Sequence, residues 1–174
     1  LKQLNKEMIN MGTMIEESIG DAVKALMKQD VELAQKVMAG DEEIDRTERK
    51  IEDLCLRLLL QQQPVARDLR NISAALKMVT DMERIGDQAT DIAEILNTGS
   101  VHVPVTAIPL QEMADYAMHM VNDSVTAYVE GKSDLAKKVI SSDDILDNLF
   151  NKVRNALDQN TMDFSSDEVL DLLM

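Results

Sequence analysis

Apolar side chains recur with the period of an α-helix over most of this chain of 174 residues. Such a stripe predicts an amphipathic helix that buries one face. Asp30 is a candidate N-cap for a second helix that runs to about residue 62, and Pro64 opens a third that continues to about residue 96. Three long helices in succession predict an all-α fold. The stripe of the first helix, between residues 3 and 28, consists of Leu4, Met8, Met11, Ile15, Ile19, Ala22, Val23 and Leu26.

The composition agrees with helices and disfavours a β-sandwich, because aromatic residues are only 2% of the chain while Met occurs 12 times. The single cysteine, Cys55, lies on an apolar stripe and is expected to be a buried small hydrophobe. No disulfide can form within the chain, no apolar run is long enough to span a membrane, and no signal peptide is recognised at Leu1. We therefore expect a cytoplasmic protein.

The chain also contains an internal repeat. The segment that begins at Asp21, DAVKALMKQDVELAQKVMAGDEEID, aligns without a gap with the segment that begins at Asp123, DSVTAYVEGKSDLAKKVISSDDILD. A period this long predicts a duplicated three-helix unit. We expect two tandem, sequence-related three-helix bundles: a first repeat at 1–98, a linker at 99–109, and a second repeat at 110–174. The second bundle is incomplete in this chain, with two helices and the start of a third.

Two of the expected helices carry a row of acids on one face. In DMERIGDQATDI, Glu83, Asp87 and Asp91 are four residues apart, and a helical wheel puts them on one arc. Gly86 lies inside the neighbouring buried stripe, where a glycine weakens the helix by about 1 kcal/mol relative to Ala and so suggests close approach of another helix. The preceding helix has a similar arc of about 60°, formed by Asp41, Asp45, Glu48 and Glu52.

A row of acids has two interpretations. The first is a solvated face, although the charges on such a face usually alternate in sign. The second is a set of metal ligands. Here Glu83, Asp87 and Asp91 form like-charge pairs, each unfavourable by about 0.2–0.5 kcal/mol, and a bound multivalent cation would reverse that repulsion. Carboxylate ligands select hard metals such as Mg²⁺, Ca²⁺, Mn²⁺ or iron. His102 and His119 add no zinc site, and the sequence offers no catalytic constellation.

The net charge of −14 restricts the partners of the chain. An acidic surface repels the phosphate backbone, so nucleic-acid binding is not expected. Capture of a bare anion is disfavoured for the same reason. Cations, or basic patches on a protein partner, are the natural complements.

The chain resembles a known family. The segment LLLQQQPVARDLRNISAALKMVTDMERIGDQATDIAEI is similar to the third-helix region of PhoU proteins, the phosphate-uptake regulators, and DEEIDRTERKIEDLC is similar to their second-helix motif. The resemblance implies two similar three-helix bundles. It also implies acid-x-x-x-acid motifs that bind metal ions, in some members as multinuclear iron clusters.

Carried over residue by residue, the resemblance implies metal ligands at Asp41, Asp45, Glu83 and Asp87. The second copy would supply Asp143 and Asp147, and Glu48 and Asp91 are additional candidates. The implied cofactors are divalent or trivalent metal ions, with iron, Mn, Mg or Zn as alternatives. Two departures matter: the second copy has no ERIGD motif in this sequence, and by register Glu48 and Glu52 correspond to Phe150 and Arg154.

The resemblance implies a cytoplasmic negative regulator of phosphate uptake and phosphate-starvation signalling. Such an adaptor would be non-enzymatic, would link the ATPase subunit of the high-affinity phosphate ABC transporter to a sensor histidine kinase, and would reach the membrane only through these partners. A homodimer is expected. Two alternatives remain open: a PhoU-like cytoplasmic domain of a sodium–phosphate cotransporter, and a metal-dependent hydrolase or oxidase that uses the carboxylate cluster.

Overall fold

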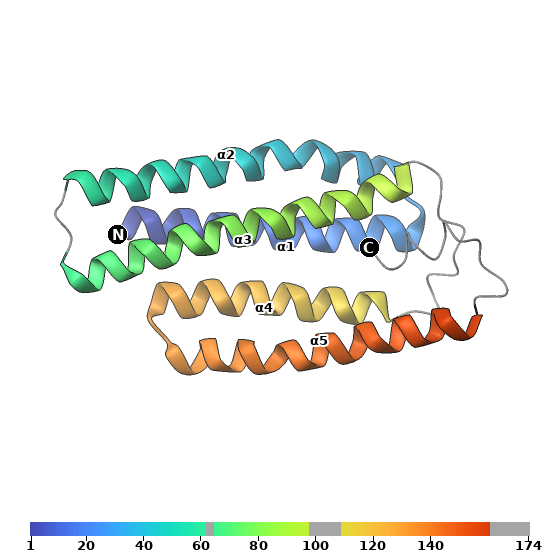
Figure 1. The fold of residues 1–174 in the computed structure, drawn as a ribbon. Helices are drawn as coiled ribbons and strands as arrows, with labels where there is room; N and C mark the ends of the chain where they lie inside the picture. Colours follow the sequence, from blue (N-terminus) through green and yellow to red (C-terminus); the bar gives the residue numbers. More distant parts are fainter. Residues whose placement is uncertain (62–64, 98–108, 161–174) are drawn as a thin grey trace.

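The computed structural model describes residues 1–61, 65–97 and 109–160, which form five α-helices and no β-strand (Figure 1). The all-α prediction is confirmed. Pro64, His102, nearly all of the predicted linker and the predicted start of a last helix after residue 160 lie outside the described residues. None of the described helices is long and apolar enough to cross a membrane. The helices are α1 (Lys2–Lys28), α2 (Val31–Gln61), α3 (Ala66–Asn97), α4 (Leu110–Glu130) and α5 (Ser133–Asn160).

The N-cap predicted at Asp30 forms in the turn between α1 and α2. Gln29 ends α1 in the left-handed conformation, with φ of 55°, and the backbone N–H of Asp30 donates to the carbonyl oxygen of Ala25 at 2.9 Å. The side chain of Asp30 accepts a hydrogen bond of 3.0 Å from the backbone N–H of Leu33, so Asp30 is the N-cap of α2. Backbone groups at the end of α1 and at the start of α2 thereby find hydrogen-bond partners.

The turn between α4 and α5 repeats this geometry at the register of the sequence repeat. Gly131 has φ of 66° and stands where Gln29 stands in the first copy. The backbone N–H of Lys132 donates to the carbonyl oxygen of Ala127 at 2.9 Å, as Asp30 does to Ala25. The two copies therefore share a turn as well as an apolar pattern.

The core runs along α1. All eight residues predicted for its apolar stripe are buried, and Leu4, Met8, Met11 and Ile15 are fully so. Helices α1, α2 and α3 pack pairwise into a three-helix bundle, α4 packs on α1, and α5 packs on α4 (Figure 1). Cys55 is buried, as predicted.

Two glycines let α4 approach α1 closely. A Cβ added at Gly12 would lie 3.1 Å from Cγ2 of Val125, and one added at Gly20 would lie 3.3 Å from Sδ of Met118. Polar contacts reinforce this packing: Asn122 Nδ2 donates to Glu16 Oε1 at 3.2 Å. The hydroxyl of Tyr128 donates to a backbone carbonyl of α3 at 3.1 Å. The α4–α5 hairpin is thus fixed against the first bundle.

Candidate metal centre

The contact between α2 and α3 depends on Gly86. This residue is buried, and a Cβ added to it would lie 3.1 Å from Cδ1 and 3.2 Å from Cγ2 of Ile44. Such distances are shorter than ordinary van der Waals contact. The prediction that Gly86 permits close approach of a neighbouring helix is confirmed. The residues directly after Ile44 and Gly86 are both aspartates.

Three aspartates converge at this contact. Carboxylate oxygens of Asp41 and Asp45, from α2, and of Asp87, from α3, all lie within 4.8 Å of one another. Asp41 and Asp45 are half-buried and Asp87 is exposed. In the described part of the chain, this is the one group of three or more candidate ligand residues at such spacing. The structure therefore brings together three of the four ligands predicted for the first repeat.

Two further side chains orient these aspartates, and the sequence interpretation missed both. The Thr90 hydroxyl, one turn after Asp87, donates to Oδ1 of Asp41 at 3.0 Å. The Arg49 guanidinium donates to Oδ2 of Asp45 at 2.9 Å and forms an ion pair with it. Arg49 lies four residues after Asp45, a spacing that signals an ion pair on a helix. No pattern in the sequence indicates Thr90.

Glu83 lies beside the three aspartates without joining their group. Burial raises the pKa of Glu83, and the charges of Asp87, Asp45 and Asp41 add to the effect. Burial also raises the pKa of Asp87, followed by the charges of Asp41, Asp45 and Asp91. In both cases the neighbouring negative charges, after burial, disfavour the ionised carboxylate. The site is therefore one that favours a positive charge.

The additional candidates lie around this group. Burial raises the pKa of Glu48, and the charges of Glu83, Glu52 and Asp45 contribute in that order. The acidic face of α2 therefore continues past Asp45 towards the other end of the helix. Asp91 lies one turn after Asp87 on the same face of α3, and its charge contributes to the raised pKa of Asp87.

The two predicted ligands of the second repeat are placed differently. Asp143 and Asp147 are exposed on α5, and neither belongs to the group formed by Asp41, Asp45 and Asp87. A metal site at Asp143 and Asp147 stays a prediction. The residues that the structure describes offer them no group of three ligands.

The donor set of the first site fits a hard cation. Two oxygens on opposite sides of one ion, at bond lengths of about 2.0–2.6 Å, stand roughly 4–5 Å apart, so a spread of 4.8 Å is compatible with a single ion. Such cations take six or more oxygen ligands. Asp41, Asp45 and Asp87 would hold the ion, and the remaining positions would fall to water or to Glu83.

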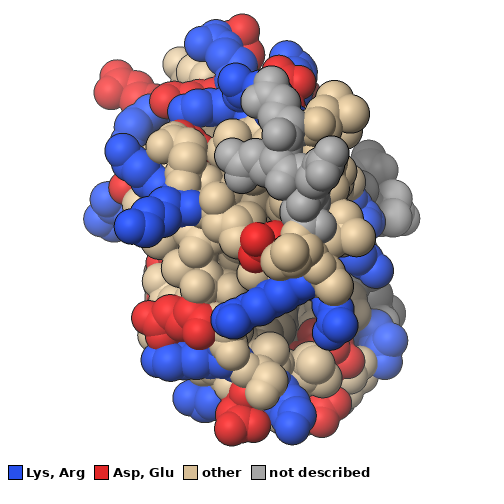
Figure 2. Space-filling view, turned by 90° about the vertical axis from the view of Figure 1, so that its left-hand side faces the viewer, with Lys and Arg blue, Asp and Glu red and all other residues tan. Residues whose placement is uncertain are grey.

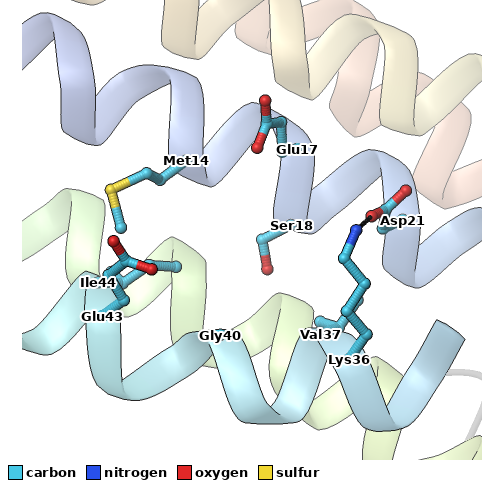
Figure 3. A pocket seen from close by; sticks show the side chains of 9 residues that line it. All are labelled: Met14, Glu17, Ser18, Asp21, Lys36, Val37, Gly40, Glu43 and Ile44. Carbon is cyan, nitrogen blue, oxygen red and sulfur yellow. Dashed lines mark hydrogen bonds and ion pairs between the residues drawn. The ribbon is translucent and has the colours of Figure 1, made fainter. Parts of the chain in front are cut away.

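A groove on another face, between α1 and α2, has a different character (Figure 3). Lys36 Nζ pairs with Oδ2 of Asp21 at 3.1 Å across it. Glu17 and Glu43 also line the groove, so carboxylates outnumber the ammonium group. This balance disfavours a bare anion such as phosphate, in agreement with the sequence.

Comparisons with known proteins agree with these features. The family model of the PhoU domain matches residues 8–96 and again residues 110–174. The chain is 39% identical over 160 residues to the "Phosphate-specific transport system accessory protein PhoU homolog" of Clostridium acetobutylicum, covering 90% of this chain and 73% of that one. The Aquifex aeolicus protein of the same name is 39% identical over 158 residues, covering 90% and 72%.

Solved structures show the same fold. The crystal structure of PhoU from Pseudomonas aeruginosa matches with a TM-score of 0.88 at 30% identity, covering 99% of this chain and 85% of that chain. The phosphate transport system regulatory protein PhoU from Streptococcus pneumoniae matches with a TM-score of 0.86 at 22% identity, covering 99% and 82%.

Proposed function

The chain belongs to the PhoU family, and from that premise we propose that it is a non-enzymatic accessory protein of a phosphate-specific transport system. It restrains phosphate uptake and phosphate-starvation signalling in the cytoplasm. It does so as an adaptor that docks on the ATPase subunit of the transporter and on a sensor histidine kinase. The names of its relatives support the first of these statements, since they describe accessory and regulatory proteins of phosphate transport.

One observation carries the metal-dependent part of the proposal, which is the convergence of Asp41, Asp45 and Asp87 from two helices. Ionised carboxylates at this spacing repel each other and push α2 away from α3. A bound metal ion supplies the positive charge that offsets this repulsion. Thr90 and Arg49 hold two of the carboxylates in place. The geometry of the first bundle, and hence its docking surfaces, would then depend on metal.

The test compares two double variants of the full chain. Asp45→Asn/Asp87→Asn removes two charges from the group, and Asp53→Asn/Asp81→Asn removes two exposed charges from the same two helices outside it. Metal content is measured by mass spectrometry after reconstitution with iron, Mn²⁺, Mg²⁺ or Zn²⁺. We expect the first variant to lose its tightly bound metal and the second to retain it. Equal metal content in both variants would refute the site.

The adaptor function is tested separately. Binding of the purified transporter ATPase subunit and of the cytoplasmic region of the kinase is measured with metal-loaded and metal-free protein. We expect wild-type protein to bind both partners more tightly when metal is present. Failure to bind either partner, in both forms, would exclude the adaptor role.

A further inference from the structure

One end of the molecule has a charge opposite to that of the whole. Residues 1–9, 50–61, 65–77 and 126–138 lie at the end where α2 meets α3 and α4 meets α5 (left in Figure 1). They hold ten of the 18 Lys and Arg of the chain but only six of its 32 Asp and Glu, a net charge of +4 against −14 for the whole. Figure 2 shows this end face-on, with Lys and Arg side chains around a surface of uncharged residues.

Large apolar side chains are exposed at the same end. They come from the last turns of α2, from the residue before α3 and from the first turn of α3, on both sides of one connection. Single exposed apolar residues are normal, but four around one connection form a patch of the kind that marks interaction sites. They are Leu56, Leu60, Val65 and Leu69, exposed by 51%, 82%, 68% and 48%.

Three arginines in the same turns have no carboxylate partner among the described residues. Arg57, Arg67 and Arg70 form no ion pair with any residue that the structure describes, although Arg57 Nε donates to the backbone carbonyl of Asp53 at 3.3 Å. By contrast, the arginines near the middle of these helices are paired, as Arg46 is with Glu42 at 2.7 Å. Unpaired guanidinium groups are unexpected in a chain with so large an excess of acids.

We propose that this basic–apolar end, formed by Leu56, Arg57, Leu60, Val65, Arg67, Leu69 and Arg70, is a docking surface for a protein partner whose own face presents carboxylates around an apolar patch. Guanidinium groups bind carboxylates in a bidentate fashion, and Arg is enriched in protein interfaces whereas Lys is depleted. The inference deepens the proposed adaptor function, on which it rests for the choice of the two proteins used as probes.

The charges within the basic–apolar end favour a protein over an anionic membrane. Asp53 and Asp68 lie among its arginines, on the last turns of α2 and in the first turn of α3. A bilayer surface is uniformly negative and would repel both of them, whereas a protein face can place its carboxylates opposite the arginines alone. The cations beside the apolar side chains are Arg rather than Lys, which is also the preference of protein interfaces.

The test places a photo-crosslinking amino acid at Leu60 in the full chain, and at Val31, an exposed residue at the opposite end, as a control. Each protein is irradiated with the purified transporter ATPase subunit, with the purified kinase cytoplasmic region, and in cells. The same set is repeated with Arg67→Glu/Arg70→Glu and with the matched reversal Lys152→Glu/Arg154→Glu on α5. Helical content and melting temperature are measured for every variant, so that a misfolded one is recognised.

We expect crosslinks to acidic segments of the partner from Leu60 but not from Val31. The crosslinking yield at Leu60 should fall at least tenfold with Arg67→Glu/Arg70→Glu but not with the α5 reversal. Crosslinks to a different protein through an acidic segment would support the surface and refute the adaptor function. Binding of the two probes that is indifferent to the arginine reversal would support the adaptor function and overturn the surface. The absence of crosslinks at Leu60, crosslinks only to a second copy of this chain, or arginine-dependent binding to phosphatidylglycerol vesicles without protein crosslinks would also overturn it.

Discussion

Replacing Gly86 by Ala should separate the packing of α2 against α3 from the helix propensity of α3. In an open position the substitution stabilises a helix by about 1 kcal/mol. Here the new methyl group would lie 3.1 Å from Cδ1 and 3.2 Å from Cγ2 of Ile44. The δ-methyl group can rotate away, but Cγ2 is bonded directly to the branched Cβ and moves only with χ1, for which Ile in a helix has one strongly preferred rotamer.

The net effect follows from these two contributions. Overpacking of a tight contact destabilises by about 1–3 kcal/mol. After the gain in helix propensity, Gly86→Ala should lower the free energy of unfolding by up to about 2 kcal/mol. In a chain of this length that corresponds to a fall of several degrees in Tm, at about 2–4 °C per kcal/mol.

Urea unfolding monitored by circular dichroism would measure the effect, with Gly40→Ala as the matched control. Gly40 is likewise inside a helix, α2, but a Cβ there meets nothing within 4 Å, so this variant should gain about 0.5–1 kcal/mol. Ile44→Val removes Cδ1, and Gly86→Ala should destabilise less in that background. Gly86 would not be at a tight contact if Gly86→Ala stabilised the chain as much as Gly40→Ala does.

Three further features can be tested by single substitutions or by labelling: the charge of Asp87, the burial of Cys55 and the ion pair between Lys50 and Glu7. Burial, then the charges of Asp41 and Asp45, raise the pKa of Asp87 in the folded chain. The folded state therefore binds more protons than the unfolded state, and stability is lost as pH rises above about 4. With metal removed by a chelator, Asp87→Asn should resist urea better than wild type at pH 7 but not near pH 4. Burial, then the charge of Glu52, raises the pKa of Cys55 to about 11. The thiol should therefore react with a disulfide reagent at pH 8 only in denaturant. Fast labelling of the native protein would contradict this. Lys50→Met removes the ammonium group that lies 2.8 Å from the buried carboxylate of Glu7. The free energy of unfolding should fall by about 1–3 kcal/mol. Adding Glu7→Gln to the same chain should restore most of that loss.

The helices and their turns could be predicted because their causes are local. The apolar period, the N-cap at Asp30 and the absence of proline inside the helices each act within a few residues, and each is visible in the sequence. The burial of Gly86 and Cys55 followed from the same period. The repeat extended the helix predictions to the second copy. The matching left-handed positions of Gln29 and Gly131 were found only in the structure.

The composition of the site could be predicted only in part, because it depends on how two helices are placed side by side. The arcs of α2 and α3 gave the acids that face the same way. They could not tell that Asp87, rather than Glu83, comes within 4.8 Å of Asp41 and Asp45. The hydrogen bond from Thr90 to Asp41 joins residues 49 positions apart and has no local signal. Such cross-helix contacts require the three-dimensional packing.

Packing and charge are linked at this site by adjacency in the sequence. Ile44 meets Gly86, and the next residue in each helix, Asp45 and Asp87, belongs to the carboxylate group. Any packing that seats Ile44 on Gly86 must therefore bring the two charges together, so the apolar contact imposes the repulsion that a cation would relieve. In the second repeat, Leu146 and Asp147 stand in the register positions of Ile44 and Asp45. A second site of the same design would thus need a glycine followed by an acid, from a third helix that seats on Leu146. Among the residues that the structure describes, no glycine packs on Leu146, and Asp147 is exposed on α5.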